Sequence, residues 1–208
     1  MINLGILISG RGSNMESILS NIFNKSIKNV TPCVVISNKS DARGLKIAKD
    51  KFNIPTEIIS QDTNQKGWNY DKNIVKILEK YDVLPTNGLI CLAGYMKILS
   101  PEFVDQYKYR IMNIHPALLP SFPGLHSQRQ ALEYGVKVSG CTVHFVDSGV
   151  DSGPIILQES TMVYDDDTED ELAARILDLE HKLYSRAVKL FSEGQIKVDG
   201  RRVIINTN

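Results

Sequence analysis

Leu4-Gly5-Ile6-Leu7-Ile8-Ser9-Gly10-Arg11-Gly12-Ser13-Asn14 is the segment most informative about the fold class, because a short apolar run stops at a glycine-rich turn that leads directly into an amphipathic segment. Residues 4–8 have the length and the uniform apolarity of a buried strand. Residues 14–23 carry their apolar side chains at helical spacing. A strand, a tight turn and a helix in this order predict the first unit of an α/β fold.

The same alternation continues through the first half of the chain. Apolar runs predict further strands at 33–36, 56–59, 89–93 and 111–114. Helices are predicted at 42–52, 68–81 and 101–107, the last with Ser100 as N-cap and Pro101 at its first position. Because strands and helices alternate, we expect a doubly wound parallel sheet.

The second half follows a different pattern. A helix is predicted at 127–134, and strands at 138–146 and 155–163 have only a turn between them, so we expect them to pair antiparallel. Thr168 and Glu171 form a capping box at the start of a helix over 168–192, and Asp199-Gly200 predicts a hairpin of 195–199 with 201–205. We expect one domain over residues 1–208: an α/β fold with a single, mostly parallel sheet, a Rossmann-like N-terminal half and antiparallel additions in the C-terminal half.

Composition restricts the classes of function. Of the 208 residues, 42% are hydrophobic, and 24 basic residues balance 24 acidic ones to a net charge of zero, which gives no support to nucleic-acid or membrane-surface binding. We find no secretory signal pattern and no apolar run near the ~20 residues that span a bilayer. The three cysteines (Cys33, Cys91 and Cys141) lie in apolar strand-like runs. We expect them to be buried thiols of a cytoplasmic protein.

The glycine turn at residues 9–14 is a candidate anion site. Glycines there let the backbone approach a ligand, and the N-terminus of the following helix attracts negative charge. The match to a dinucleotide fingerprint is partial, because Met15 stands at the third glycine position and the second strand ends in Ser37-Asn38 without an acidic residue. We therefore favour a phosphate monoester over NAD, with a plain tight turn as the alternative.

Candidate catalytic groups lie in Asn113-Ile114-His115-Pro116 and in Asp151-Ser152-Gly153-Pro154. On a strand, Asn113 and His115 share one face, at the carboxyl end where open α/β sheets bind ligands. The amide and the imidazole can donate hydrogen bonds to a tetrahedral oxyanion, and the Asp151 carboxylate can manage protons on an attacking amine. These groups suit transfer of an acyl carbon between two nitrogens. A structural histidine and a backbone-capping asparagine are the alternatives. The four histidines and three cysteines show no metal-ligand spacing, so we expect no metal.

Five segments in order carry a resemblance to a known family. They are Ile8-Ser9-Gly10-Arg11-Gly12-Ser13-Asn14, Leu92-Ala93-Gly94-Tyr95-Met96-Lys97-Ile98-Leu99-Ser100, Asn113-Ile114-His115-Pro116-Ala117-Leu118-Leu119-Pro120, His144-Phe145-Val146 and Asp151-Ser152-Gly153-Pro154-Ile155-Ile156. Together they resemble the folate-dependent phosphoribosylglycinamide formyltransferases of purine biosynthesis, over residues 2–206. The resemblance implies that 10-formyltetrahydrofolate, as co-substrate, gives its formyl group to the amine of phosphoribosylglycinamide.

The resemblance also implies residue roles. Asn113, His115 and Asp151 would be catalytic. Residues 1–110 would form a phosphate-binding half, with Gly12, Ser13 and Asn14 at the substrate phosphate, and residues 111–208 a catalytic and folate-binding half. Glu180 would contact the substrate; its alternative is a solvated helix glutamate. The residues implied for the folate pocket are Met96, Lys97, Ile98, Leu99, Val143 and His144.

Two positions depart from the family pattern or match it loosely. Lys97 stands where the family usually has arginine, which matters only if the guanidinium itself contacts the folate. Lys66 is the nearest candidate for an additional basic residue at the phosphate. The partners implied are small molecules, without nucleic acid or membrane, for a monomer or a homodimer.

Rival functions remain open at this point. One is a sibling activity that transfers the formyl group to methionyl-tRNA, to an amino sugar nucleotide or to water. The zero net charge and the missing C-terminal barrel argue against the tRNA enzyme, and the first strand at residue 4 leaves no room for the regulatory domain of the hydrolases. Another is a non-catalytic nucleotide-binding module or a dehydrogenase with a degenerate fingerprint, against which Met15 and Ser37-Asn38 count.

Overall fold

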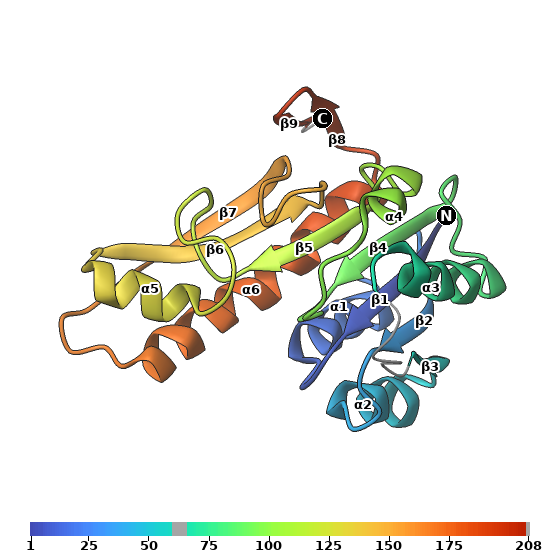
Figure 1. Cartoon of the computed structure of the whole chain (residues 1–208), viewed down its shortest axis with the longest axis horizontal. Helices are drawn as coiled ribbons and strands as arrows, with labels where there is room; N and C mark the ends of the chain where they lie inside the picture. The colour runs from blue at the N-terminus through green and yellow to red at the C-terminus, as the bar shows by residue number, and fades with distance from the viewer. Residues whose placement is uncertain (60–65, 207–208) are drawn as a thin grey trace.

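A computed structural model describes residues 1–59 and 66–206 of the chain. Its centre is a seven-stranded sheet in the order β3-β2-β1-β4-β5-β6-β7 (Figure 1). The strands are β1 (Ile2–Ile8), β2 (Val30–Ser37), β3 (Thr56–Ile58), β4 (Gly88–Leu92), β5 (Ile111–His115), β6 (Val138–Phe145) and β7 (Ile155–Met162). The pairs among β1 to β5 are parallel, whereas β6 pairs antiparallel with both β5 and β7. The predicted α/β fold with antiparallel additions is confirmed.

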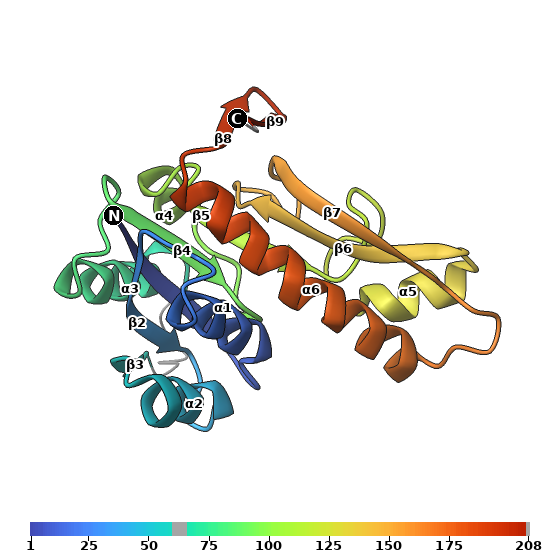
Figure 2. The same ribbon diagram turned by 180° about the vertical axis from the view of Figure 1, so that it is seen from behind.

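Six helices pack on the two faces of the sheet in the described part of the chain. They are α1 (Ser13–Phe23), α2 (Arg43–Phe52), α3 (Trp68–Lys80), α4 (Pro101–Gln106), α5 (Ser127–Tyr134) and α6 (Glu169–Ser192). Helices α1, α2, α5 and α6 contribute to one apolar core, and α3 and α4 to a second core on the opposite face. Figure 2 shows α6 lying along the back of the sheet. A small hairpin of β8 (Ile196–Asp199) and β9 (Arg202–Ile205) follows.

Local chemistry explains where several elements begin. Thr168 and Glu171 form the predicted capping box at α6, and the Ser100 hydroxyl accepts a hydrogen bond from the Phe103 amide at the start of α4. These side chains satisfy backbone N–H groups that have no partner within the helix. Most predicted bounds agree with the structure to within three residues.

Two expectations need correction. The connection between β6 and β7 is longer than a turn, because residues 146–154 separate the two strands. Cys33 is half-buried, whereas Cys91 and Cys141 are buried. The reason is that Cys33 lies in the first half of β2, which is less covered than the second half.

The faces of β5 and β6 decide where the polar groups point. Met112, Ile114 and Val143 belong to the apolar core that includes α6. Because side chains alternate along a strand, Asn113, His115 and His144 point to the opposite face. Asn113 and His144 are direct neighbours in the register of β5 and β6. The two strands thus bring an amide and an imidazole side by side.

Candidate active site

The Asp151 carboxylate contacts both polar side chains of β5, Asn113 and His115. Its Oδ2 lies 3.3 Å from His115 Nδ1, and its Oδ1 accepts a hydrogen bond of 3.4 Å from Asn113 Nδ2. Asp151 lies in the connection between β6 and β7, which folds back over the end of β5. The structure therefore brings together the three residues predicted from the sequence as an oxyanion and proton-transfer group.

Both ring nitrogens of His115 face oxygen atoms. Its Nε2 lies 2.8 Å from the carbonyl oxygen of Phe122, which can only accept. Its Nδ1 faces the Asp151 carboxylate. A neutral imidazole has one N–H and would present a lone pair to one of these oxygens, whereas an imidazolium donates to both. His115 is buried, and the adjacent Asp151 carboxylate is placed to stabilise the imidazolium form.

His144 is a neutral neighbour of this pair. Burial lowers the pKa of its ring below the usual value. Its Nδ1 lies 2.9 Å from the carbonyl oxygen of Phe145, so the neutral ring carries its proton there. Its Nε2 is then an acceptor, 3.2 Å from Asn113 Nδ2. The Asn113 amide is therefore shared between His144 and Asp151 at two long distances, compared with the usual 2.9 to 3.0 Å.

The backbone around Asp151 is held in an unusual conformation. Asp151 has φ 49, the left-handed region that non-glycine residues seldom adopt. Three contacts fix it: the Gly124 amide donates to Asp151 Oδ2 at 2.8 Å, the Ser152 hydroxyl donates to Asp147 Oδ1 at 2.6 Å, and Arg201 donates to the Ser152 carbonyl at 2.9 Å. Strained backbone of this kind persists where surrounding contacts impose it, often at functional sites.

The glycine turn forms the first turn of α1 as the sequence predicts. Gly12 is its N-cap with φ 78, and a Cβ placed there would lie 2.7 Å from the Gly44 Cα. Ser13 begins the helix, and the Asn14 side chain donates to Glu180 Oε2 at 2.7 Å. The Asn14 Oδ1 is buried without a hydrogen-bond partner among the described residues. Because this oxygen can only accept, a ligand that presents an N–H or O–H donor at this turn would satisfy it.

Glu180 is a buried residue of α6. Burial raises the pKa of its carboxyl, while the Asn14 bond and the charge of Arg11 act in the opposite direction. The simple alternative of a solvated helix glutamate is therefore wrong. Asn14 and Glu180 are 166 positions apart, and no periodicity in the sequence predicts their contact.

The segment predicted for the folate pocket lies between β4 and α4. Met96 and Ile98 expose 65% and 76% of their surface, which is unusual for large apolar side chains, whereas Leu99 is buried. The Lys97 ammonium lies 3.3 Å from the centre of the Tyr70 ring. His144 faces the Asn113 side of the sheet, but Val143 is fully buried in the α6 core, so its side chain lines no open surface.

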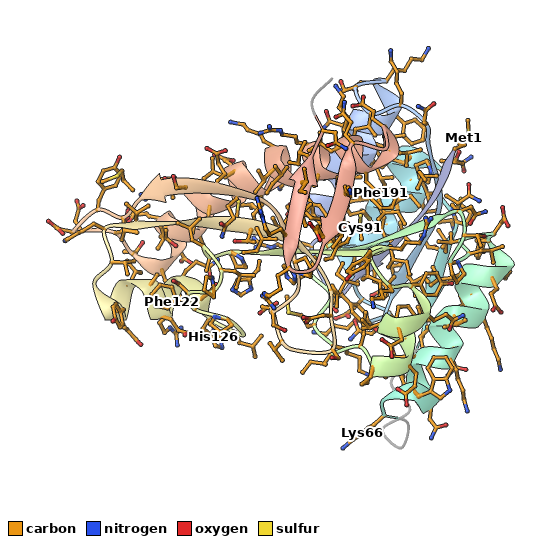
Figure 3. The ribbon with its side chains drawn as sticks, turned by 90° about the horizontal axis from the view of Figure 1, so that it is seen from above. Met1, Lys66, Cys91, Phe122, His126 and Phe191 are labelled. Carbon is orange, nitrogen blue, oxygen red and sulfur yellow. The ribbon has the colours of Figure 1, made fainter. Side chains whose placement is uncertain are left out.

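Other residues near these groups carry weaker sequence signals. Residue type alone does not reveal the contacts of four further residues. They are the Phe122 carbonyl with His115, the Gly124 amide with Asp151, the Ser9 hydroxyl with the Met96 amide, and the Asp71 carboxylate with the Ser100 amide. The turn-forming pair Pro123-Gly124 was the one sequence signal for any of them. Lys66 is exposed beside α3, whereas Phe122 and His126 lie near α5 (Figure 3). Among residues 1–59 and 66–206, no cluster of three or more histidine, cysteine or acidic side chains could hold a metal ion, and no helix is long and apolar enough to cross a membrane.

Comparison with known proteins agrees with this geometry. The formyl transferase family matches residues 2–188. A phosphoribosylglycinamide formyltransferase of Escherichia coli (strain K12) is 39% identical over 209 residues, which cover 97% of this chain and 96% of that protein. The crystal structure of glycinamide ribonucleotide transformylase 1 from Symbiobacterium toebii superposes with a TM-score of 0.94 at 44% identity, covering 100% of this chain and 95% of the other.

A further solved structure extends the comparison. The phosphoribosylglycinamide formyltransferase from Anaplasma phagocytophilum has a TM-score of 0.89 at 41% identity, over 99% of this chain and 95% of the other. The family match, the sequence identity to the relatives and the structural superposition all extend over almost the whole chain. The chain belongs to the formyl transferase family.

Proposed function

We propose that this chain transfers the formyl group of 10-formyltetrahydrofolate to the amine of 5'-phosphoribosylglycinamide. The products are phosphoribosyl-N-formylglycinamide and tetrahydrofolate, in de novo purine biosynthesis. The observation that carries the proposal is the contact of Asp151 with both Asn113 and His115. The relatives named phosphoribosylglycinamide formyltransferase support the choice of substrates.

The chemistry begins when the substrate amine attacks the formyl carbon. A bond forms between this nitrogen and the carbon, and the carbonyl electron pair moves to oxygen as a tetrahedral oxyanion. Asn113 donates to this oxygen from an amide held by long hydrogen bonds, which can be redirected at small cost. His115 donates the second hydrogen bond to the oxyanion. To do so, one ring nitrogen gives up its contact with the Phe122 carbonyl or with the Asp151 carboxylate.

Proton transfer completes the reaction. The attacking amine becomes an ammonium and loses a proton to Asp151, directly or through one water. The bond between the formyl carbon and N10 of the folate then breaks as N10 receives a proton. The amine thus loses one hydrogen and tetrahydrofolate gains one. Asp151 also keeps His115 charged and oriented.

Separate groups of residues bind the two substrates. Gly12, Ser13 and Asn14 bind the substrate phosphate at the N-terminus of α1, and Glu180 contacts the substrate beside Asn14. Residues 96–99 and His144 contact the folate, with Met96 and Ile98 as apolar surface. We further propose that the protein is cytoplasmic and acts on small molecules without nucleic acid, as a monomer or homodimer.

The first test follows the folate absorbance after the protein is mixed with 10-formyltetrahydrofolate, with and without phosphoribosylglycinamide. Deformylation that requires the amine supports the transferase. Deformylation without it would instead identify a hydrolase, and no change with either mixture would contradict the proposal.

The Asp151→Asn variant should retain binding of the phosphorylated amine but lose turnover by about 10²-fold or more. Near-normal activity of this variant across pH would remove Asp151 from the mechanism.

A further inference from the structure

The segment 95–100 between β4 and α4 is held at both ends by buried side chains from other parts of the chain. Ser9, at the end of β1, accepts a hydrogen bond from the Met96 amide at 2.8 Å and donates to Asn38 Oδ1 at 2.6 Å. At the other end, Asp71 of α3 accepts from the Ser100 amide at 2.6 Å. The backbone of the segment is therefore fixed by contacts with two distant elements.

Asp71 is an unusual residue for this task. Only 2% of its surface is exposed, and burial raises the pKa of its carboxyl. Buried carboxylates are rare unless they are paired, because the loss of hydration is costly. A bond from a backbone N–H to a carboxylate is shorter and stronger than one between neutral groups. Because desolvation offsets much of that gain, we attribute to Asp71 the placement of Ser100 more than net stability.

Lys97 supplies the opposite charge. Its ammonium lies 3.3 Å from the centre of the Tyr70 ring, and the Asp71 carboxylate acts on it electrostatically. A cation at this distance over an aromatic face is attracted by the ring. The Lys97 side chain therefore turns toward α3, while its neighbours Met96 and Ile98 are exposed. Lys97 thus adds a side-chain contact with α3 to the two backbone contacts at the ends of the segment.

We propose that Asp71 and Tyr70 position residues 95–100 for the folate, with Lys97 as their internal partner. This inference rests on the proposed function. A pterin ring is flat and has donors and acceptors along its edge, so it needs backbone groups at fixed places and apolar side chains over its face. Residues 96–99 supply both. Asp71 and Tyr70 are positioning residues that act through the segment. The Lys97 ammonium interacts with these two residues of α3 and not with the folate.

The test compares kinetic constants of matched variants. Asp71→Asn keeps the shape of the side chain and removes its charge, and Lys97→Met removes the cation. Both should raise the KM for 10-formyltetrahydrofolate about tenfold or more, since displaced binding groups are costly. The KM for phosphoribosylglycinamide and kcat at saturating folate should stay within about twofold. Lys97→Arg should recover most of the lost affinity, and Asp105→Asn, an exposed change in α4, is the control.

Thermal unfolding and calorimetric titration with tetrahydrofolate separate the outcomes. Unchanged folate KM and Kd in folded Asp71→Asn and Lys97→Met would overturn the inference. A parallel loss of kcat, both KM values and thermal midpoint would also overturn it, because that pattern indicates a general structural role. If the unmodified protein binds tetrahydrofolate but does not formylate the amine, the proposed function fails, and a raised Kd in the variants still supports the inference. If it binds no folate, both fail.

Discussion

Among single residues, the roles of the two site histidines follow from which atoms face their ring nitrogens. The His115 ring faces two oxygen atoms, whereas His144 donates to a backbone carbonyl and accepts from Asn113. Two histidines at neighbouring positions thus have different roles. His144 orients the Asn113 amide, and His115 contacts the Asp151 carboxylate.

Replacing Asn113 by alanine tests the oxyanion role. Asn113→Ala should lower kcat by about 10²–10³-fold, because one preorganised donor to the transition state is lost. The KM values for both substrates should change little, since the donor acts mainly on the developing charge. Steady-state kinetics with each substrate varied in turn measures this. Asn206→Ala, an exposed change, is the control; an unchanged kcat in Asn113→Ala would exclude the role.

His144 makes stability depend on pH. Its pKa is lowered in the folded protein, while in the unfolded chain it is about 6.5. As pH falls below that value, His144 becomes protonated in the unfolded chain but stays neutral in the folded protein. The free energy of unfolding therefore decreases. The free energy of unfolding should therefore fall more steeply between pH 7.5 and 5.5 (about two units spanning that pKa) in the unmodified protein than in His144→Gln. Urea denaturation at both pH values checks this; equal slopes would contradict it.

At the scale of elements, the glycine turn needs glycine at one position for two reasons. Gly12 has a positive φ, and its Cα approaches the backbone of Gly44 in α2. Gly10 is subject to neither restriction, because a Cβ there would meet nothing within 4 Å. The two glycines look alike in the sequence, yet only one is required by the packing of α1 against α2.

Alanine at these two glycines should have different effects. Gly12→Ala should lower the free energy of unfolding by at least about 1–2 kcal/mol, the cost of the left-handed conformation for a residue with a Cβ. It should also raise the KM for phosphoribosylglycinamide, because the first turn of α1 shifts. Gly10→Ala, as the matched control, should stay within about 0.5 kcal/mol. Urea denaturation measures both, and equal losses would refute the argument.

At the scale of the whole molecule, α6 joins the two halves of the sheet. Its fully buried Tyr184 donates to the carbonyl of Met112 at 2.8 Å and lies 3.3 Å from that of Leu92. These carbonyls belong to β5 and β4. Helix α6 also contacts α1 through Asn14 and Glu180. The N-terminal and C-terminal halves therefore share one helix and one continuous sheet.

This arrangement predicts a single cooperative unfolding transition. Urea unfolding followed by the fluorescence of Trp68, the only tryptophan, should have the same midpoint as far-ultraviolet circular dichroism. Tyr184→Phe should lower the free energy of unfolding by about 1–3 kcal/mol, because a buried carbonyl loses its partner. Both signals should shift together. Exposed Tyr134→Phe is the control; separate midpoints would show that the halves unfold independently.

The sequence alone was enough to predict the elements, because strands, helices, caps and glycine turns depend on neighbouring residues. The capping box of Thr168 and Glu171 and the antiparallel pair β6–β7 were predicted correctly from short-range patterns. It also placed Asn113 and His115 on one face of a strand. The length of the connection after β6 and the burial of Cys33 were predicted wrongly, because both depend on what packs nearby.

Contacts between residues far apart in the chain became visible in the three-dimensional structure. Asp151 approaches His115 and Asn113, Glu180 meets Asn14, and Asp71 holds Ser100. The Lys97 side chain turns toward Tyr70, a direction that residue type cannot give. The physical reason is that these contacts depend on strand order and on how helices pack on the sheet. Periodicity records which face of an element is apolar, but it does not record which element will cover that face.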